Sequence, residues 1–347
     1  MKNHSIKDLL LSTTLKSKVT INGWVRTFRA NRFIALNDGS SISSIQCVID
    51  FENFEESILK KINTGTSLEI TGDLVESQGS GQKFEIIVSK LNILGECDTE
   101  KFPIQPKKHS FEFLRENAHL RTRTSTFSAI MRLRSSLSFA VHNYFNSNGF
   151  YYVNTPIITS SDAEGAGEQF RVTTLDPKNP PLNKNSEVDF TKDFFGKETS
   201  LTVSGQLEAE TYAMSLGKVY TFGPTFRAEN SNTSRHLSEF WMIEPEVAFM
   251  DLNGNMDLAE SFLKYLLQYI LQNNIEDLEF LEQRLINEDK TKPQNLRSEM
   301  TLIDKINFVI SNDFMRVSYT EAFEILKNCK HNKKKKFKSI FRKWLSE

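Results

Sequence analysis

The chain has 347 residues, of which 39% are hydrophobic and 25% are charged, a composition typical of globular proteins with room for two domains. Its 43 basic and 44 acidic residues nearly balance, which excludes attraction to nucleic acid through net charge, so any RNA binding requires local contacts. Three widely spaced cysteines, Cys47, Cys97 and Cys329, predict neither a disulfide framework nor a zinc site, and no apolar run reaches membrane-spanning length, so we expect a cytoplasmic protein without a membrane partner.

Residues 19–94 predict a small barrel. The alternating segments that predict strands are Val19–Thr27, Arg32–Asn37, Ser43–Asp50, Ser67–Glu76 and Phe84–Leu94. A short helix, Phe54–Ile62, is predicted between the third and fourth strands. Five strands with a helix at this point are typical of a Greek-key barrel of the OB type, and a sandwich fragment is the alternative. We therefore predict a first domain over residues 1–100, followed by a linker with prolines and lysines over residues 101–125.

Residues 126–329 predict a second domain. Apolar residues recur at helical spacing from Thr126 to Asn148, and Gly149 supplies a stop. A strand is predicted from Phe150 to Pro156, and helices after Asp257 carry one apolar side that would cover a sheet. The last segment, residues 330–347, changes into a basic tail.

A hairpin is predicted in the middle of the second domain. Its first strand would be Phe226–Glu229, and its second would start at Phe240, with apolar residues alternating against acidic ones. So many charges on a rigid sheet must be matched or bound to something, although a solvated hairpin with scattered ion pairs is the plain alternative. The charged residues are Arg227, Glu229, Arg235, His236, Glu244 and Glu246.

The hairpin resembles the second signature motif of class II aminoacyl-tRNA synthetases through Phe226, Arg227, Glu229, His236 and Phe240. From about Val19 to about Cys329 the chain is similar to asparaginyl-tRNA synthetases in particular. The resemblance implies an α+β protein, with an OB-type anticodon-binding barrel followed by an antiparallel class II sheet flanked by helices. The helix, strand and proline before Ile157 resemble the first class II motif, which forms the dimer interface in the family, so a homodimer is expected.

The family activates asparagine with ATP and transfers it to tRNA(Asn). A carboxylate is already ionised at neutral pH, so activation requires alignment and charge neutralisation at phosphorus rather than a general base. Arg227 suits this catalytic role, because a guanidinium can span an α-phosphate oxygen and the substrate carboxylate. The resemblance implies ATP as cosubstrate, with Mg²⁺ as its complex. The ATP-binding residues that it implies are Arg227, Glu229, Arg235, His236, Leu237 and Phe240.

The segment from Ser204 to Glu210 bears on the choice of amino acid. Ala209 stands where aspartate-specific relatives place a lysine, and an acid without that lysine repels aspartate but accepts an amide N–H. A lysine substrate would also suit Glu210, so electrostatics alone leaves a lysine enzyme open. The residues that the resemblance places at the amino acid are Glu164, Ser204, Gln206, Glu210 and Arg227, with Glu164 on a glycine-rich lid.

The barrel is expected to read the tRNA anticodon. An aromatic ring offers a stacking platform, amide and carboxylate groups recognise base edges, and arginine contacts phosphate. The residues at the corresponding positions are Arg26, Phe33, Gln46 and Glu85.

The chain departs from the family pattern after Cys329. We find neither the glycine-rich third class II motif, which ends in an arginine that covers adenine, nor the acidic residues that hold magnesium in relatives, so the metal ligands are unknown. We therefore expect the class II core to be incomplete in residues 1–347 and this chain alone to be inactive, or nearly so, in adenylation. A non-catalytic tRNA-binding or dimerisation remnant is the alternative. An enzyme that makes free asparagine is a third interpretation, against which the barrel argues.

Overall fold

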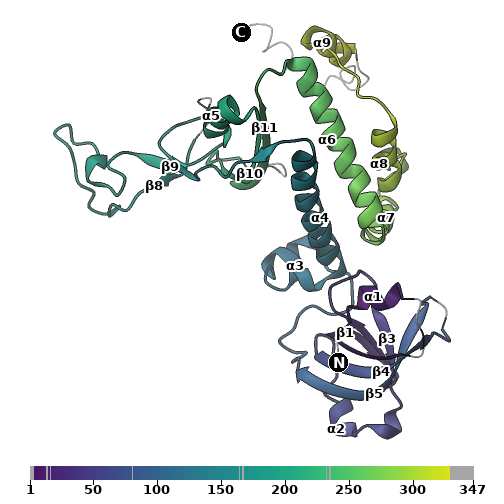
Figure 1. The fold of residues 1–347 in the computed structure, drawn as a ribbon. Helices are drawn as coiled ribbons and strands as arrows, with labels where there is room; N and C mark the ends of the chain where they lie inside the picture. The colour runs from purple at the N-terminus through teal and green to yellow at the C-terminus, as the bar shows by residue number, and fades with distance from the viewer. Residues whose placement is uncertain are drawn as a thin grey trace.

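The computed structural model describes residues 4–328, except 13, 14, 16, 80, 164, 166, 167, 232, 234 and 235. The predicted basic tail, residues 330–347, lies outside the described residues. A barrel at one end is joined by a linker and one long helix to a sheet with flanking helices, which confirms the predicted α+β class (Figure 1). In the described part of the chain, no helix combines the length and the apolar character needed to cross a bilayer.

The N-terminal domain is a closed five-stranded barrel in the order β1-β2-β3-β5-β4. Its strands are β1 (Lys18–Arg29), β2 (Phe33–Asn37), β3 (Ile45–Val48), β4 (Ser67–Glu76) and β5 (Phe84–Gly95). All pairs are antiparallel except β3 with β5, so the prediction of an OB-type barrel is confirmed. The predicted helix over residues 54–62 is too long: a 3₁₀ turn, η1 (Phe51–Asn53), precedes a single turn, α2 (Glu56–Leu59), whose N-cap Glu55 makes no capping bond.

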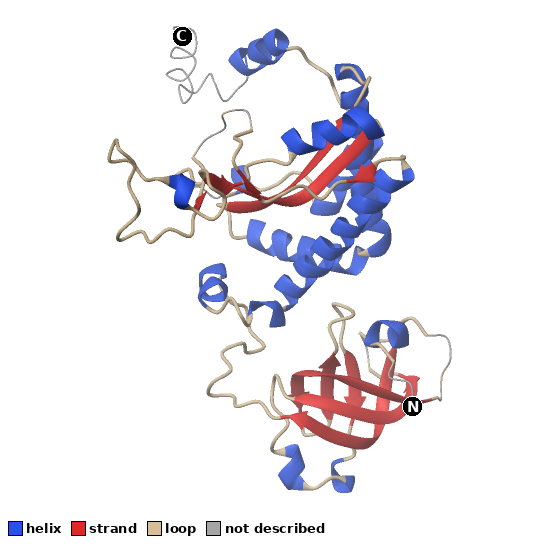
Figure 2. Ribbon diagram, turned by 60° about the vertical axis from the view of Figure 1, so that its left-hand side comes forward, coloured by secondary structure: helices blue, strands red, loops and turns tan. Residues whose placement is uncertain are grey.

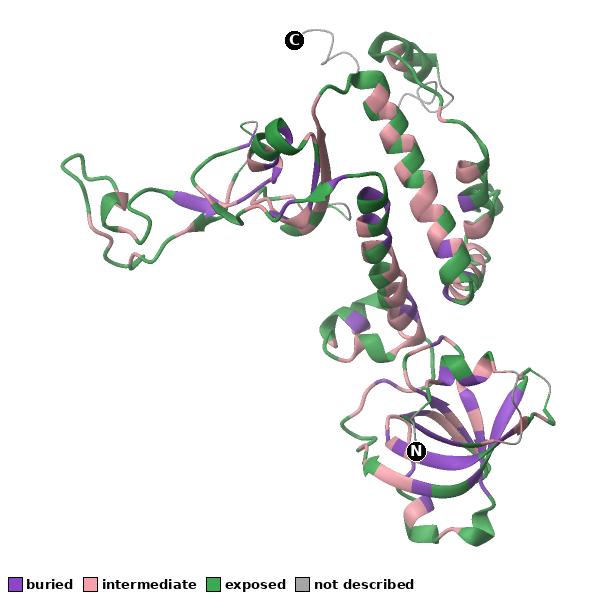
Figure 3. Cartoon of the chain, in the orientation of Figure 1, coloured by how far each residue is buried: buried purple, intermediate pink, exposed green. Residues whose placement is uncertain are grey.

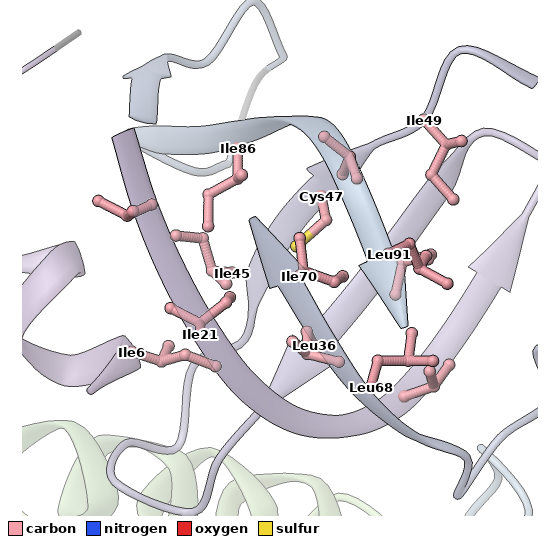
Figure 4. Close-up of a cluster of buried hydrophobic side chains, with 14 of the residues drawn as sticks. Ile6, Ile21, Leu36, Ile45, Cys47, Ile49, Leu68, Ile70, Ile86 and Leu91 are labelled. Carbon is pink, nitrogen blue, oxygen red and sulfur yellow. The ribbon is translucent and has the colours of Figure 1, made fainter. Parts of the chain in front are cut away.

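Alternate residues of the barrel strands fill its interior (Figures 3 and 4). Ile21, Leu36 and Ile70 are fully buried there together with Cys47, because side chains alternate between the two faces of a strand. Helix α1 (Ile6–Leu10), capped by the Ser5 hydroxyl, places Ile6 against this core. The barrel therefore has a hydrophobic core of its own.

Helix α4 connects the barrel to the second domain (Figure 1). It is preceded by α3 (Phe111–Glu116) and the turn η2 (Arg121–Arg123), and it spans Ser125–Ser147. Its N-cap Thr124 accepts a hydrogen bond from the Phe127 N–H, and Gly149 follows its end at a φ of 77°, which glycine adopts without strain. The predicted helix and its glycine stop are confirmed within one residue.

The sheet of the second domain is three-stranded, in the order β11-β10-β6 (Figure 2). Strands β10 (Lys218–Phe226) and β11 (Glu239–Val247) are antiparallel, whereas β6 (Tyr151–Tyr152) pairs parallel to β10. Two predicted strands are thus wrong in extent. The first strand of the hairpin, β10, ends at Phe226 and does not include residues 227–229, which were predicted to belong to it. In the predicted strand over residues 150–156, only Tyr151 and Tyr152 join the sheet.

One face of this sheet packs on helices α4 and α6. Tyr220, Phe222 and Ile243 meet Phe145 and Phe262 there, and the Phe145 and Tyr220 rings stack at 4.5 Å between centroids. The remaining helices are α5 (Gln206–Leu216), α6 (Leu252–Asn273), α7 (Ile275–Asp289), α8 (Leu302–Ser311) and α9 (Tyr319–Asn328), with turns η3 (Phe190–Lys192) and η4 (Gln294–Leu296). A second small sheet contains β7 (Ile158–Thr159), β9 (Thr199–Leu201) and β8 (Arg171–Val172).

A buried ion pair ties the two domains together. Arg132 of α4 donates from Nε and Nη2 to Asp277 of α7 at 2.6–3.1 Å, and its Nη1 donates to the Gly39 carbonyl of the barrel at 3.0 Å. Ser41, in the same β2–β3 connection as Gly39, donates to Glu276 at 3.1 Å. The barrel is therefore held against the helices by hydrogen bonds to Arg132, whose charge Asp277 neutralises, and to Glu276.

Candidate active site

The sheet face opposite α4 and α6 carries polar residues. In the register of the hairpin, Thr221 lies opposite Glu244, Val219 opposite Glu246, and Thr225 opposite Phe240. Because paired residues point to the same side, these side chains share one face. Helix α5 packs on this side through a small apolar cluster with Val219.

Glu244 is the most firmly held of these groups. Its carboxylate accepts hydrogen bonds from the Ser204 hydroxyl, from the Gly205 N–H at 3.1 Å and from the Thr221 hydroxyl at 2.8 Å. The Ser204 oxygen also accepts the Gln206 N–H at 3.1 Å. Ser204, predicted to contact the substrate, thus orients Glu244 in this structure.

Three carboxylates gather on this face. Burial raises the pKa of Glu246 to about 7, and the negative charges of Glu210 and then Glu244 add to the effect. Gln206 donates from Nε2 to Glu210 at 2.9 Å, which orients that carboxylate across one turn of α5. The site thus favours a cation or an N–H donor and disfavours a further carboxylate.

Arg227 follows the end of β10 on the same side. Its backbone N–H donates to the Ser238 carbonyl at 3.0 Å, and its guanidinium lies 5.6 Å from the centroid of the Phe240 ring. Its Nε is buried and has no hydrogen-bond acceptor among the described residues. A buried donor without an acceptor is costly, and an oxyanion is a group that could pair with this guanidinium.

The other predicted ATP residues lie farther out. Glu229, His236 and Leu237 are exposed in the connection between the two strands, and His236 is hydrogen-bonded through Nδ1 to the Thr233 hydroxyl. Glu164 and Arg235 lie outside the described residues. The contacts of these five residues with substrates therefore stay a prediction.

Glu244 and Glu246 were not predicted to be site residues, although their alternation with apolar residues is visible in the sequence. Two acidic residues separated by one position, on a strand whose other face is apolar, are the signal for a polar site on the second face. The donors that hold Glu244, the Thr221 hydroxyl and the Gly205 N–H, lie at positions that no local pattern connects to it.

The barrel brings together three of the four predicted anticodon residues on neighbouring strands. Gln46 donates to Glu85 at 3.1 Å across β3 and β5, and Phe33 of β2 is paired in register with Val48 of β3. Arg26 is not part of this group. A register shift in β1 between Val25 and Thr27 turns it toward the linker, where it donates to the Arg123 carbonyl.

Within the described ranges, no group of three or more His, Cys, Asp or Glu side chains could hold a metal ion. We therefore assign no magnesium ligands to these residues.

Two family models match the chain. Residues 110–343 match the model of the tRNA synthetases class II (D, K and N), and residues 19–94 match the model of the OB-fold nucleic acid binding domain. The chain is 55% identical over 331 residues to an asparagine–tRNA ligase of Cytophaga hutchinsonii, covering 94% of this chain and 68% of the relative. It is likewise 55% identical over 333 residues to that of Borreliella burgdorferi, covering 94% and 69%.

A solved structure shows the same arrangement. The crystal structure of asparaginyl-tRNA synthetase from Pyrococcus horikoshii complexed with asparaginyl-adenylate superposes with a TM-score of 0.72 at 26% identity, covering 95% of this chain and 68% of that one.

Proposed function

Because this chain belongs to the asparagine–tRNA ligases, ATP-dependent class II aminoacyl-tRNA synthetases, we propose that it binds asparagine and ATP on the polar face of the β10–β11 hairpin. In the proposed reaction, an asparagine carboxylate oxygen attacks the α-phosphorus of ATP, and pyrophosphate leaves. A terminal hydroxyl of tRNA(Asn) then attacks the acyl carbon of the adenylate, AMP leaves, and the hydroxyl proton is released. Mg²⁺ bound to the ATP would offset phosphate charge.

Arg227 carries this proposal. Its buried Nε lacks an acceptor among the described residues, and its guanidinium lies over the Phe240 ring, 5.6 Å from the ring centroid. A planar, permanently charged fork of this kind can hold the substrate carboxylate and an α-phosphate oxygen together, which aligns them for in-line attack. Since one side of the Phe240 ring faces Arg227, the adenine would stack on the other side, with Glu229, Arg235, His236 and Leu237 closing around the nucleotide.

The carboxylate cluster would select the amino acid. Glu210, held by Gln206, accepts from the side-chain amide of asparagine, while Glu244 adds negative charge that repels an aspartate side chain. Ser204 acts through Glu244, and Glu164 would receive the α-ammonium group. Truncating Ser204 would leave Glu244 with two of its three donors.

The barrel would bind the tRNA. Phe33 offers a ring for stacking, and the Gln46–Glu85 pair offers donors and acceptors for base edges. We propose that residues 1–100 are the anticodon-binding domain, 101–125 the linker, 126–329 the class II core and 330–347 a separate basic tail. Homodimerisation through α4 and β6 is supported by Tyr151 and Tyr152, which are 58% and 47% exposed beside that helix. A cytoplasmic location suits such an enzyme.

We further propose that residues 1–347 alone have little or no adenylation activity. Their sequence contains no counterpart of the glycine-rich third class II motif, so nothing in these residues supplies the arginine that covers adenine in relatives. Vigorous asparagine-dependent ATP–pyrophosphate exchange by this polypeptide would contradict this part of the proposal.

Binding of a non-hydrolysable asparaginyl-adenylate analogue tests the site without requiring turnover. We expect isothermal titration to show binding of the analogue, a loss of at least about tenfold in Arg227→Gln, and weaker binding of the aspartyl analogue. The exposed Arg171, paired with Glu198, supplies the control variant Arg171→Gln, which should bind as the wild type does. Equal binding by Arg227→Gln would refute the assigned role.

The same titration separates the alternative function. A non-catalytic tRNA-binding or dimerisation remnant would bind RNA through the barrel but would bind neither analogue. The polar face of the hairpin favours the ligase, because a remnant has no need for a carboxylate held by three donors.

A further inference from the structure

A large pocket lies at the junction of the two domains, remote from the hairpin. It has a volume of about 550 Å³ and is lined by β1, by the linker and by the start of α4, with α7 closing one side. Its charged lining residues are Arg26, Lys107, Lys108, Arg123 and Arg284. No acidic side chain lines it among the described residues, so the pocket attracts anions.

Most of these cations have no counter-charge in the described part of the chain. Arg284 is paired with Glu288 at 3.0 Å, but neither Arg26 nor Arg123 forms an ion pair with a carboxylate in the described part of the chain. Burial lowers the pKa of Arg26, and the positive charges of Arg123 and then Arg132 lower it further. Holding partly buried like charges together costs free energy, which a bound anion would offset.

Aromatic rings hold the second arginine in place. The Arg123 guanidinium lies 5.3 Å from the ring centroid of Trp24 and 6.0 Å from that of Phe102. A guanidinium stacked on rings keeps its in-plane N–H donors free for an oxyanion. Arg26 of the barrel donates to the backbone carbonyl of Arg123 in the linker, and the charges of the two guanidinium groups repel each other across this contact.

We propose that this junction pocket binds a phosphate group of the tRNA backbone, with Arg26 and Arg123 as its ligands. The inference rests on the proposed function, because the RNA is the one whose anticodon the barrel reads. The barrel and the β10–β11 hairpin lie at opposite ends of α4, a helix of 23 residues (Figure 1). An RNA that reaches both must pass the junction, and the contact would fix the distance between its two ends.

Salt-dependent RNA binding tests the proposal. We would measure fluorescence anisotropy of labelled tRNA(Asn) transcript and of its isolated anticodon hairpin, with wild type and with Arg26→Gln/Arg123→Gln. We expect the variant to bind the transcript about tenfold more weakly at low salt, with the slope of log K against log salt smaller by about 2, and to bind the hairpin unchanged. Arg26→Lys/Arg123→Lys keeps the charges and should keep the slope, which a purely structural role would not predict.

The remaining outcomes would contradict the proposal. The matched control Arg134→Gln/Lys305→Gln removes two exposed charges elsewhere, and an equal loss of RNA affinity in this control would mean that net charge alone explains the result. An equal loss of affinity for the transcript and for the isolated hairpin would show that Arg26 contacts the anticodon arm instead. Full transcript binding by the folded glutamine variant would overturn the proposal while leaving the proposed function intact, whereas no RNA binding by the wild type would remove both.

A small phosphate compound could also bind to the two arginines in place of an RNA phosphate. If the pocket takes a small phosphate compound, inorganic pyrophosphate will raise the melting temperature of Arg227→Gln protein, and adding Arg26→Gln/Arg123→Gln will abolish that rise. This result together with unchanged transcript binding would overturn the assignment to RNA.

Discussion

Replacing Glu246 by glutamine should remove a pH-dependent penalty on folding. The folded-state pKa of this carboxyl is raised from 4.5 to about 7, so the native state binds its proton more tightly than the unfolded state does. The associated stability is fully present below about pH 4.5 and is lost as the pH rises through about 7. The shift corresponds to roughly 3 kcal/mol, which solvent screening of a half-buried group reduces to about 1 kcal/mol.

The assay is urea unfolding between pH 4 and pH 8, followed by Trp241 fluorescence in a background with Trp24 and Trp344 replaced by phenylalanine. We expect Glu246→Gln to gain about 1 kcal/mol over its background between pH 4 and pH 8. Glu239→Gln, at the exposed start of β11, should show no such change. A difference that is constant with pH, or that grows toward acid, would refute the reasoning.

Two further substitutions test the packing. Arg132→Leu leaves the buried Asp277 unpaired and should lower the free energy of unfolding by about 3–5 kcal/mol. The double variant Arg132→Leu/Asp277→Leu should recover most of this loss in the same urea assay. Equal loss in both variants would contradict the ion-pair account. Gly72→Ala should lower the melting temperature of the barrel, because a Cβ there would lie 2.1 Å from the Ile87 carbonyl oxygen. Gly79→Ala should not, because the atom nearest to its added Cβ would be 3.6 Å away. Similar melting temperatures for both variants would contradict this explanation.

The barrel was predictable because its strands are amphipathic. From Ile21 to Val25, buried residues of β1 alternate with the exposed residues Asn22 and Trp24, and such a pattern indicates which side is buried before any partner is known. The length of α4 followed in the same way from its apolar spacing and from Gly149. Both elements are determined by local periodicity together with a recognisable stop.

The hairpin shows where this reasoning fails. Arg227 and Glu229 alternate as strand residues do, but β10 ends at Phe226, and its strand character comes from upstream residues such as Val219. The role of Ser204 was equally hidden, because its bond to Glu244 joins residues that are forty positions apart. The direction of Arg26 depends on a bulge in β1, which no residue pattern announces.

The buried thiol inside the barrel has a practical consequence. Burial raises the pKa of Cys47, so in the closed barrel it is both inaccessible and protonated, and a thiolate-directed reagent can reach it only when the strands separate. Cys97, after the last barrel strand, is partly exposed, so the same reagent can reach it in the closed state even though burial raises the pKa of its thiol too. The delay between alkylation of Cys97 and alkylation of Cys47 therefore measures how often the barrel opens.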